Sequence, residues 1–128
     1  MSWRIETTDE FDGWVDGLSR DLQDRVAAGV AILREDGPIA GRPLVDSIKG
    51  SRHSNMKEMR TGTIRVLFAF DPHRAAILLI GGDKRGQWES WYRRSIPRAD
   101  QLLDQHLLRL GGRKRKRYAH GKKAKNIC

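Results

Sequence analysis

Apolar and polar residues first alternate and then repeat at helical spacing in the N-terminal part of the chain. Trp3, Ile5 and Thr7 alternate with polar neighbours, which predicts a first strand. Thr8 and Ser19 each precede apolar residues at helical spacing, and both are residue types that cap helices. Two consecutive helices are therefore predicted, the second ending at the Asp-Gly-Pro of residues 36–38.

The most apolar part of the chain follows and predicts three short strands. The strands are expected at residues 56–60, 64–70 and 75–80. Tight turns are expected between them, at Thr61-Gly62 and at the Asp-Pro-His-Arg of residues 71–74. The third strand is apolar on both faces, which is typical of a strand covered on both sides, and it is expected to open into a Gly-rich turn.

A last helix is predicted over residues 96–110. Its apolar residues repeat at helical spacing, Ser95 is its expected cap, and Pro97 fits a first helical turn. The pair Gly111-Gly112 is expected to end it.

The predicted elements follow the order β-α-α-β-β-β-α. Residues 41–55 are rich in Gly, Ser, Pro and charge, and they are expected to connect the helices to the sheet, anchored by Leu44, Val45 and Ile48. Helices packed on one antiparallel-rich sheet define an α+β fold, with the first strand placed beside one of the later strands.

Charge divides the chain into unequal parts. The net charge is +9, and residues 111–128 hold eight Lys or Arg and no acid. That segment has no apolar period, so a disordered basic tail is expected after a single domain over residues 1–110. Within this domain, residues 1–46 carry a net −5 and residues 47–110 a net +6. The asymmetry favours a polyanionic partner, most simply nucleic acid, over an ordinary solvated basic face.

Several classes of site find no support in the sequence. Cys128 is the only cysteine, so no intrachain disulfide or cysteine-based metal site can form, and a reducing cytoplasm is the expected compartment. The four histidines are scattered and no Gly-rich phosphate loop is present, so neither a metal nor a cofactor is expected. No apolar run approaches the length of a membrane span.

Basic side chains gather in the predicted sheet. Arg60 and Arg65 flank one tight turn, so a regular hairpin brings them together, and Lys84 and Arg85 end the last strand at the same edge. Guanidinium groups bind phosphate through paired hydrogen bonds and stay charged near neutral pH. Each cation alone is more simply a solvated or acid-paired residue; the cluster together with the charge asymmetry favours phosphate recognition.

Aromatic residues follow this cluster directly. Trp88, Trp91 and Tyr92 are candidates for stacking on unpaired bases, although tryptophans three residues apart are more often core contacts. Lys57 has the opposite strand parity to Arg60 and is therefore expected to bind rather than catalyse. The full set of predicted RNA contacts is Lys57, Trp88, Trp91, Arg93, Arg94, Arg113, Lys114 and Arg115.

Three motifs resemble the RelE/ParE superfamily of type II toxins, and most closely its HigB-like, phage-derived branch. They are Lys57-Glu58-Met59-Arg60, Ile64-Arg65-Val66-Leu67 and the strand end at Gly81 to Lys84, and the resemblance covers about residues 3–110. It implies a compact RelE-like fold and a cytoplasmic, ribosome-dependent mRNA endonuclease. It also implies a neighbouring helix-turn-helix antitoxin, with the ribosome and mRNA as the other partners.

The resemblance also implies roles for individual residues. The ribose 2′-hydroxyl would attack its own phosphate without a metal, with Arg60 and Arg65 holding that phosphate. Lys84 or Arg85 would stabilise the pentacovalent state or protonate the leaving oxygen, and Tyr92 or Trp91 would stack on a base or assist proton transfer. Relatives carry lysines where Met56 and Glu58 stand, or a late His or Tyr, so the general base is left unassigned.

Two other functions stay open at this point. ParE-like relatives share the fold but poison DNA gyrase and lack nuclease activity. The chain could also be a non-enzymatic module that binds nucleic acid through its basic tail.

Overall fold

The computed structural model describes residues 2–83, 85 and 88–119, with residue 88 and residues 112–119 placed by their backbone alone. Its centre is one five-stranded sheet in the order β1-β5-β4-β3-β2, in which β1 is parallel to β5 and the other pairs are antiparallel. The elements in chain order are β1 (Arg4–Thr7), α1 (Asp9–Asp16), α2 (Arg20–Asp36), a 3₁₀ turn η1 (Gly37–Ile39), β2 (Val45–Ser47), β3 (Lys57–Thr61), β4 (Ile64–Phe70), β5 (Ala75–Asp83) and α3 (Trp88–Ala119). The predicted α+β class is confirmed.

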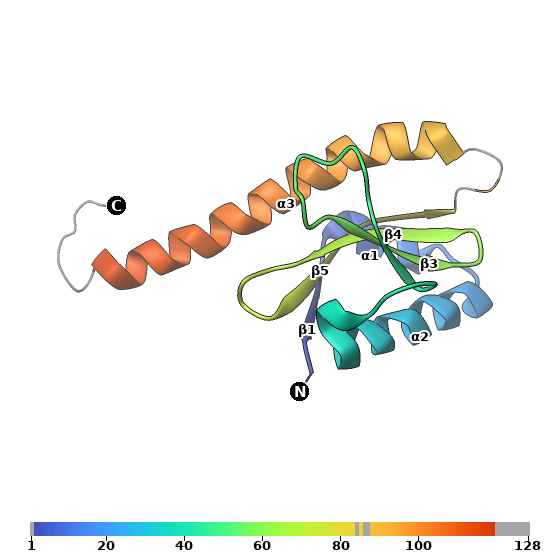
Figure 1. Cartoon of the computed structure of the whole chain (residues 1–128), viewed down its shortest axis with the longest axis horizontal. Helices are drawn as coiled ribbons and strands as arrows, with labels where there is room; N and C mark the ends of the chain where they lie inside the picture. The colour runs from blue at the N-terminus through green and yellow to red at the C-terminus, as the bar shows by residue number, and fades with distance from the viewer. Residues whose placement is uncertain (1, 84, 86–87, 120–128) are drawn as a thin grey trace.

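Helices cover both faces of the sheet. Figure 1 shows α3 along one face and α2 along the other. Alternate residues of β4 supply the two cores, because successive side chains of a strand point to opposite faces. Ile64, Val66 and Phe68 pack with residues of α1 and α2, whereas Leu67 and Ala69 pack with residues of α3.

The N-caps predicted for the first two helices are confirmed, whereas Ser95, the cap predicted for the last helix, lies inside α3. The Thr8 hydroxyl accepts a hydrogen bond from the Phe11 amide at 3.0 Å and donates one to the carbonyl of Leu79 at 2.7 Å. The Ser19 hydroxyl accepts from the Leu22 amide at 3.3 Å. Thr8 thus starts α1 and at the same time ties it to β5.

The short strand β2 lies inside the segment that was predicted to be a connector. It pairs antiparallel with β3 through Val45 and Met59, Asp46 and Glu58, and Ser47 and Lys57. This strand has only three residues, two of them polar, and is too short to show the alternation of apolar and polar residues that predicts a strand from sequence. The strand forms because β3 would otherwise leave its outer edge unpaired.

The predicted turn after residue 80 was wrong, because β5 continues through Gly81 and Gly82 to Asp83. A Cβ atom on Gly81 would lie 2.2 Å from Trp14 of α1, and one on Gly82 would lie 2.1 Å from Trp91 of α3. The two glycines therefore leave room for one tryptophan on each face of the strand. They were interpreted as turn residues, yet they are close-packing residues inside a strand.

The bounds predicted for the last helix were also wrong. α3 begins at Trp88, carries Pro97 in its interior and continues past Gly111 to Ala119. Proline removes one intrahelical hydrogen bond, and the burial of Ile96 before it and Ala99 after it holds both sides of this turn against the core. Figure 1 shows the C-terminal part of α3 extending beyond the sheet.

Several polar contacts anchor α3 to the rest of the domain. Among them, Arg98 donates to Glu10 of α1 at 2.6 Å, and Asp104 accepts from Arg52 at 2.7 Å. Another joins His106 to Asp71 of the β4–β5 turn at 2.8 Å, and both side chains are buried. Burial alone would raise the pKa of Asp71, but hydrogen bonds from His106 and from two backbone amides outweigh it and hold that pKa below its usual value.

Gly82→Ala should destabilise the fold by about 1–3 kcal/mol, the usual cost of overpacking a core, because its Cβ would displace the Trp91 ring. Gly13→Ala in α1 is the matched control, since nothing lies within 4 Å of a Cβ there, and it should be neutral or stabilising by about 0.5–1 kcal/mol. Urea denaturation of both variants measures the difference. Equal stabilities would contradict this account of the glycine pair.

Candidate functional site

The β3–β4 hairpin places Arg60 directly opposite Arg65. Thr61 pairs with Ile64, which leaves only Gly62 and Thr63 in the turn, and Gly62 has a φ of 60° that suits glycine. Directly opposed residues of an antiparallel pair project from the same face, so both arginine side chains lie on the face covered by α3. The register confirms the prediction that these two arginines are neighbours.

The carboxylate of Glu58 lies between the two arginines. Its oxygens are 3.5 Å from Arg60 Nε and 3.8 Å from Arg65 Nε, and it accepts a hydrogen bond from the Tyr92 hydroxyl at 2.6 Å. Glu58 is only 5% exposed, so its charge depends on these partners. Glu58, Arg60, Arg65 and Tyr92 are called the arginine site below.

The two guanidinium groups differ in exposure and in how tightly they are bonded. Arg65 is 6% exposed, and its Nη1 donates to the carbonyls of Gly62 at 2.6 Å and Ile64 at 2.8 Å. The Arg60 side chain is 35% exposed, and its ion pairs with Asp46 of β2, at 3.4 Å, and with Glu58, at 3.5 Å, are long. Arg65 is therefore held in place, whereas Arg60 can exchange its loose ion pairs for a ligand.

Tyr92 belongs to the site as a neutral phenol. Burial, followed by the hydrogen bond to Glu58, raises the pKa of Tyr92 to about 12. Ionisation would place a phenolate beside a carboxylate, which explains the direction of the shift. Tyr92 is thus a hydrogen-bond donor near neutral pH, and not a base.

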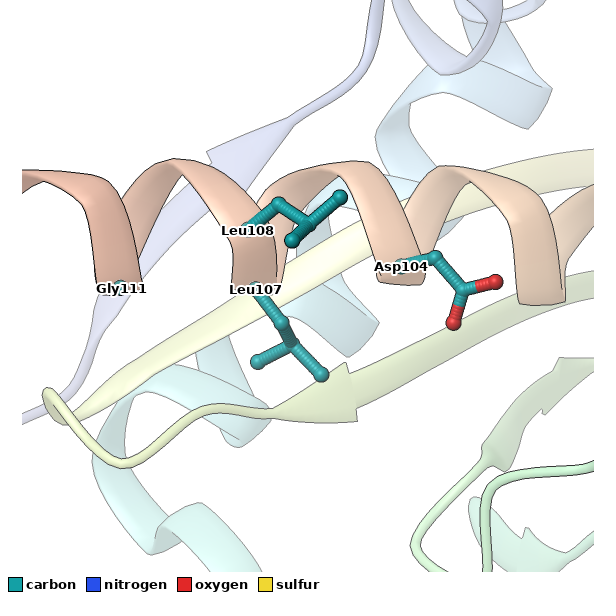
Figure 2. A pocket seen from close by; sticks show the side chains of 4 residues that line it. All are labelled: Asp104, Leu107, Leu108 and Gly111. Atoms are coloured by element: carbon teal, nitrogen blue, oxygen red, sulfur yellow. The ribbon is translucent and has the colours of Figure 1, made fainter. Parts of the chain in front are cut away.

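A surface hollow of about 440 Å³ opens beside the arginine site. Pro43 and Leu44 line it from the segment that leads into β2, and Arg60, Gly62 and Arg65 line it from the hairpin. A larger hollow of about 480 Å³ lies along α3 and is lined by Asp104, Leu107, Leu108 and Gly111 (Figure 2). Among the described residues, the lining of this larger hollow is one acidic and two apolar side chains and a glycine, which does not suit a phosphate.

Arg85 lies at the predicted end of the sheet but outside the arginine site. β5 ends at Asp83, which pairs with Ile64 next to the hairpin turn, so Arg85 follows at the same end as Arg60 and Arg65. Its guanidinium, however, binds Asp83 at 2.8 Å and is exposed. The predicted role of Lys84 lies outside the described residues.

Neither Lys57 nor Trp91 is part of the arginine site. Lys57 pairs with Phe68, which packs against the helices of the opposite face, as its strand parity predicted. Trp91 is 7% exposed, packs over Gly82, and meets Tyr92 edge to face at 5.1 Å between ring centroids. Stacking of the Trp91 ring on a base was therefore a wrong prediction, because the ring is a core contact.

The remaining predicted RNA contacts are only partly described. Arg93 and Arg94 are exposed on α3. The side chains of Trp88, Arg113, Lys114 and Arg115 lie outside the described part of the structure. Their roles stay predictions.

Glu58 is the site residue that sequence reasoning missed. Its position two residues before Arg60 gives it the same strand parity, and this signal was available in the sequence. It was considered only as an acid that might pair with a lone arginine. Asp46 was missed as well, because its contact with Arg60 depends on the unexpected strand β2.

The described residues include neither a metal-binding cluster nor a membrane-spanning helix. No group of three or more His, Cys, Asp or Glu side chains in that part of the chain could hold a metal ion. The helices there include none that is both long and apolar enough to cross a membrane.

Comparison with known sequences gives one family and two similar proteins. Residues 13–104 match the model of the phage-derived Gp49-like proteins. The candidate toxin HigB2 of Mycobacterium tuberculosis is 44% identical over 122 residues, which cover 91% of this chain and 60% of HigB2. The candidate toxin HigB3 of the same organism is 50% identical over 100 residues, covering 77% of this chain and 88% of HigB3. The match to HigB2 thus spans less than two thirds of that protein.

Comparison with solved structures identifies the fold. The archaeal RelE–RelB complex from Pyrococcus horikoshii matches with a TM-score of 0.56 and 19% identity, over 68% of this chain and 99% of that chain. A free E. coli RelE mutant matches with a TM-score of 0.51 and 12% identity, over 77% and 98%. At these low sequence identities, the structural similarity shows that the chain has a RelE fold.

Glu58→Gln should lower the pKa of Tyr92 from about 12, because the neutral amide no longer opposes the phenolate. Burial of the ring is unchanged, so the pKa should stay above its usual value. Tyr118→Phe leaves Tyr92 as the only tyrosine, and its ultraviolet absorbance against pH then reports a single ionisation. An unchanged pKa would show that Glu58 does not control this phenol.

Proposed function

The chain belongs to the phage-derived Gp49-like family, and from this membership together with its RelE fold we propose that it is a toxin that cuts mRNA on the ribosome. The observation that carries the proposal is the arginine site. Two guanidinium groups face each other across a tight turn, beside a buried carboxylate and an open hollow. Such a cluster suits a phosphodiester, whose negative charge grows in the transition state.

The chemistry proposed is attack by a ribose 2′-hydroxyl on the adjacent phosphate. The bond from O2′ to phosphorus forms while the bond from phosphorus to the leaving 5′ oxygen breaks. Arg60 and Arg65 bind the non-bridging oxygens, Arg65 as the held group and Arg60 as the one that leaves its loose ion pairs. No metal takes part in this scheme.

Glu58 is proposed to accept the proton of the 2′-hydroxyl. When the phosphate draws the guanidinium groups to itself, the carboxylate loses part of their charge and faces the substrate. Tyr92 holds Glu58 in position through its 2.6 Å hydrogen bond. For the leaving 5′ oxygen, Arg85 is the proposed charge-stabilising group, since it follows β5 at the end of the sheet where Arg60 and Arg65 lie. Lys84, its neighbour in the sequence, is proposed to donate the proton that this oxygen takes up as it leaves.

The proposed protein partner is a cognate antitoxin encoded next to this chain. Related folds were solved with their antitoxins, as in the RelE–RelB complex of P. horikoshii and the RelB–RelE complex of Methanococcus jannaschii, which has a TM-score of 0.54. A small helix-turn-helix protein in the neighbouring reading frame would support this assignment.

The basic segment of residues 111–128 is proposed to bind ribosomal RNA. Its eight Lys or Arg residues and absence of acids suit contacts to phosphates without sequence readout. This role is separate from cleavage at the arginine site.

Arg65→Ala should reduce mRNA cleavage about 10²–10³-fold through loss of a transition-state donor, and Glu58→Gln about 10²–10⁴-fold through loss of the base. Inducible expression followed by mapping of 5′ ends on translated mRNA measures both effects. Arg20→Ala on exposed α2 surface is the matched control and should cut like wild type. Circular dichroism checks that each variant folds.

An Arg65→Ala protein as growth-inhibitory as wild type, with the same cleavage map, would contradict the proposal. Induction of the DNA-damage response without mRNA cuts would instead support gyrase poisoning.

Replacing the eight Lys or Arg of residues 111–128 by Gln should weaken ribosome binding and flatten its salt dependence. Each phosphate contact that is lost should reduce the steepness of log affinity against log salt concentration by about 0.7–0.9. Co-sedimentation with ribosomes over a range of salt concentrations gives both quantities. Wild-type binding that does not change with salt would rule out this role of the segment.

A further inference from the structure

The hollow beside the arginine site has an apolar wall that the proposed phosphate chemistry does not use. Pro43 and Leu44 form this wall and line the hollow together with Arg60, Gly62 and Arg65. Leu44 also packs against the core on the α2 side, where its Cδ1 lies 3.5 Å from the position of a Cβ on Gly29. Its volume of about 440 Å³ falls within the ~300–1,000 Å³ of small-ligand sites. The wall is tied to the arginine site, because the Leu44 carbonyl accepts a hydrogen bond from the Arg60 amide at 2.7 Å.

A phosphate by itself would contact the guanidinium groups and leave the apolar wall empty. A nucleotide has both kinds of surface, an anionic phosphate and a base with flat apolar faces and polar edges. We propose that the hollow binds the nucleobase next to the scissile phosphate, with Pro43 and Leu44 against the face of the base. The proposal rests on the proposed function and assigns a base-binding subsite within it.

The two aromatic residues near the site whose side chains the structure describes, Trp91 and Tyr92, are not placed to take this role. Trp91 is covered by its packing over Gly82, and Tyr92 is partly buried with its hydroxyl bound to Glu58. In the described part of the hollow, the apolar surface available to a base is therefore aliphatic. Base faces also pack against aliphatic side chains and guanidinium planes.

The turn residue Gly62 lines the hollow from the hairpin. Its φ of 60° disfavours any side chain, and a Cβ there would lie 3.6 Å from Nη1 of Arg25 in α2. The exposed Arg25 is therefore close to this turn.

A titration of the full-length protein with a 2′-deoxy dinucleoside monophosphate, which cannot be cleaved by 2′-hydroxyl attack, tests the subsite. The probe should shift the NMR signals of the Leu44 methyl groups and of the Arg60 and Arg65 Nε–H groups. Inorganic phosphate should shift only the arginine signals. Leu44→Asn should weaken dinucleotide binding about tenfold, as expected for loss of contact with one base face, and change phosphate binding less than twofold.

Two further variants control for packing and for surface polarity. Leu44→Met conserves the apolar volume and should bind the dinucleotide like wild type. Leu108→Asn changes a leucine that is 71% exposed on α3 and should also leave binding unchanged. Thermal unfolding confirms that each variant keeps its fold.

Arginine signals that shift with the dinucleotide while the Leu44 methyl groups stay unmoved would overturn the subsite and leave the phosphate site intact. If the purified antitoxin moves the Leu44 methyl groups and the dinucleotide does not, the wall is a protein-docking surface and the proposal is wrong. Arginine signals that respond to neither probe would count against the proposed function itself.

Discussion

The packing of two tryptophans against adjacent glycines of β5 is the constraint on which the rest of the structure depends. Trp14 lies over Gly81 on one face and Trp91 over Gly82 on the other, so one strand positions both α1 and α3. Because Trp91 is held in this way, the next residue of α3, Tyr92, reaches across to Glu58 of β3. The core packing of the sheet and the geometry of the arginine site are therefore coupled.

In the arginine site, the attraction of both arginines to Glu58 offsets the repulsion between them. Two guanidinium groups near each other repel, and a buried carboxylate without partners is costly, so Glu58 and the arginines stabilise one another. The distances of 3.5 and 3.8 Å are those of loose ion pairs, longer than good hydrogen bonds. An arrangement of this kind can give up its internal pairs to a phosphate more easily than a tightly bonded network could. The ion pair between Arg60 and Asp46, at 3.4 Å, is similarly long.

Sequence reasoning reached the arginine pair but not the full composition of the site. Arg60 and Arg65 could be predicted as neighbours because both flank one tight turn. The turn predicted at Thr61-Gly62 was one residue too early, since Thr61 pairs with Ile64 and the turn is formed by Gly62 and Thr63. Glu58 shares the parity of Arg60, yet its burial depends on α3, which lies far along the chain. Trp91 was assigned to the wrong environment, since an aromatic residue beside cations looks the same in sequence whether it is exposed or buried.

The sequence by itself determined the α+β class, the two helix caps, the arginine hairpin and the opposite parity of Lys57. Each of these follows from local periodicity or from a turn of a few residues, which need no distant partner. Only the tertiary structure decided that Gly81 and Gly82 lie inside a strand, that β2 pairs at the edge of the sheet, and that α3 runs through Pro97. These features depend on contacts between segments far apart in the chain, and packing there outweighs the local preferences of glycine, proline and short polar segments.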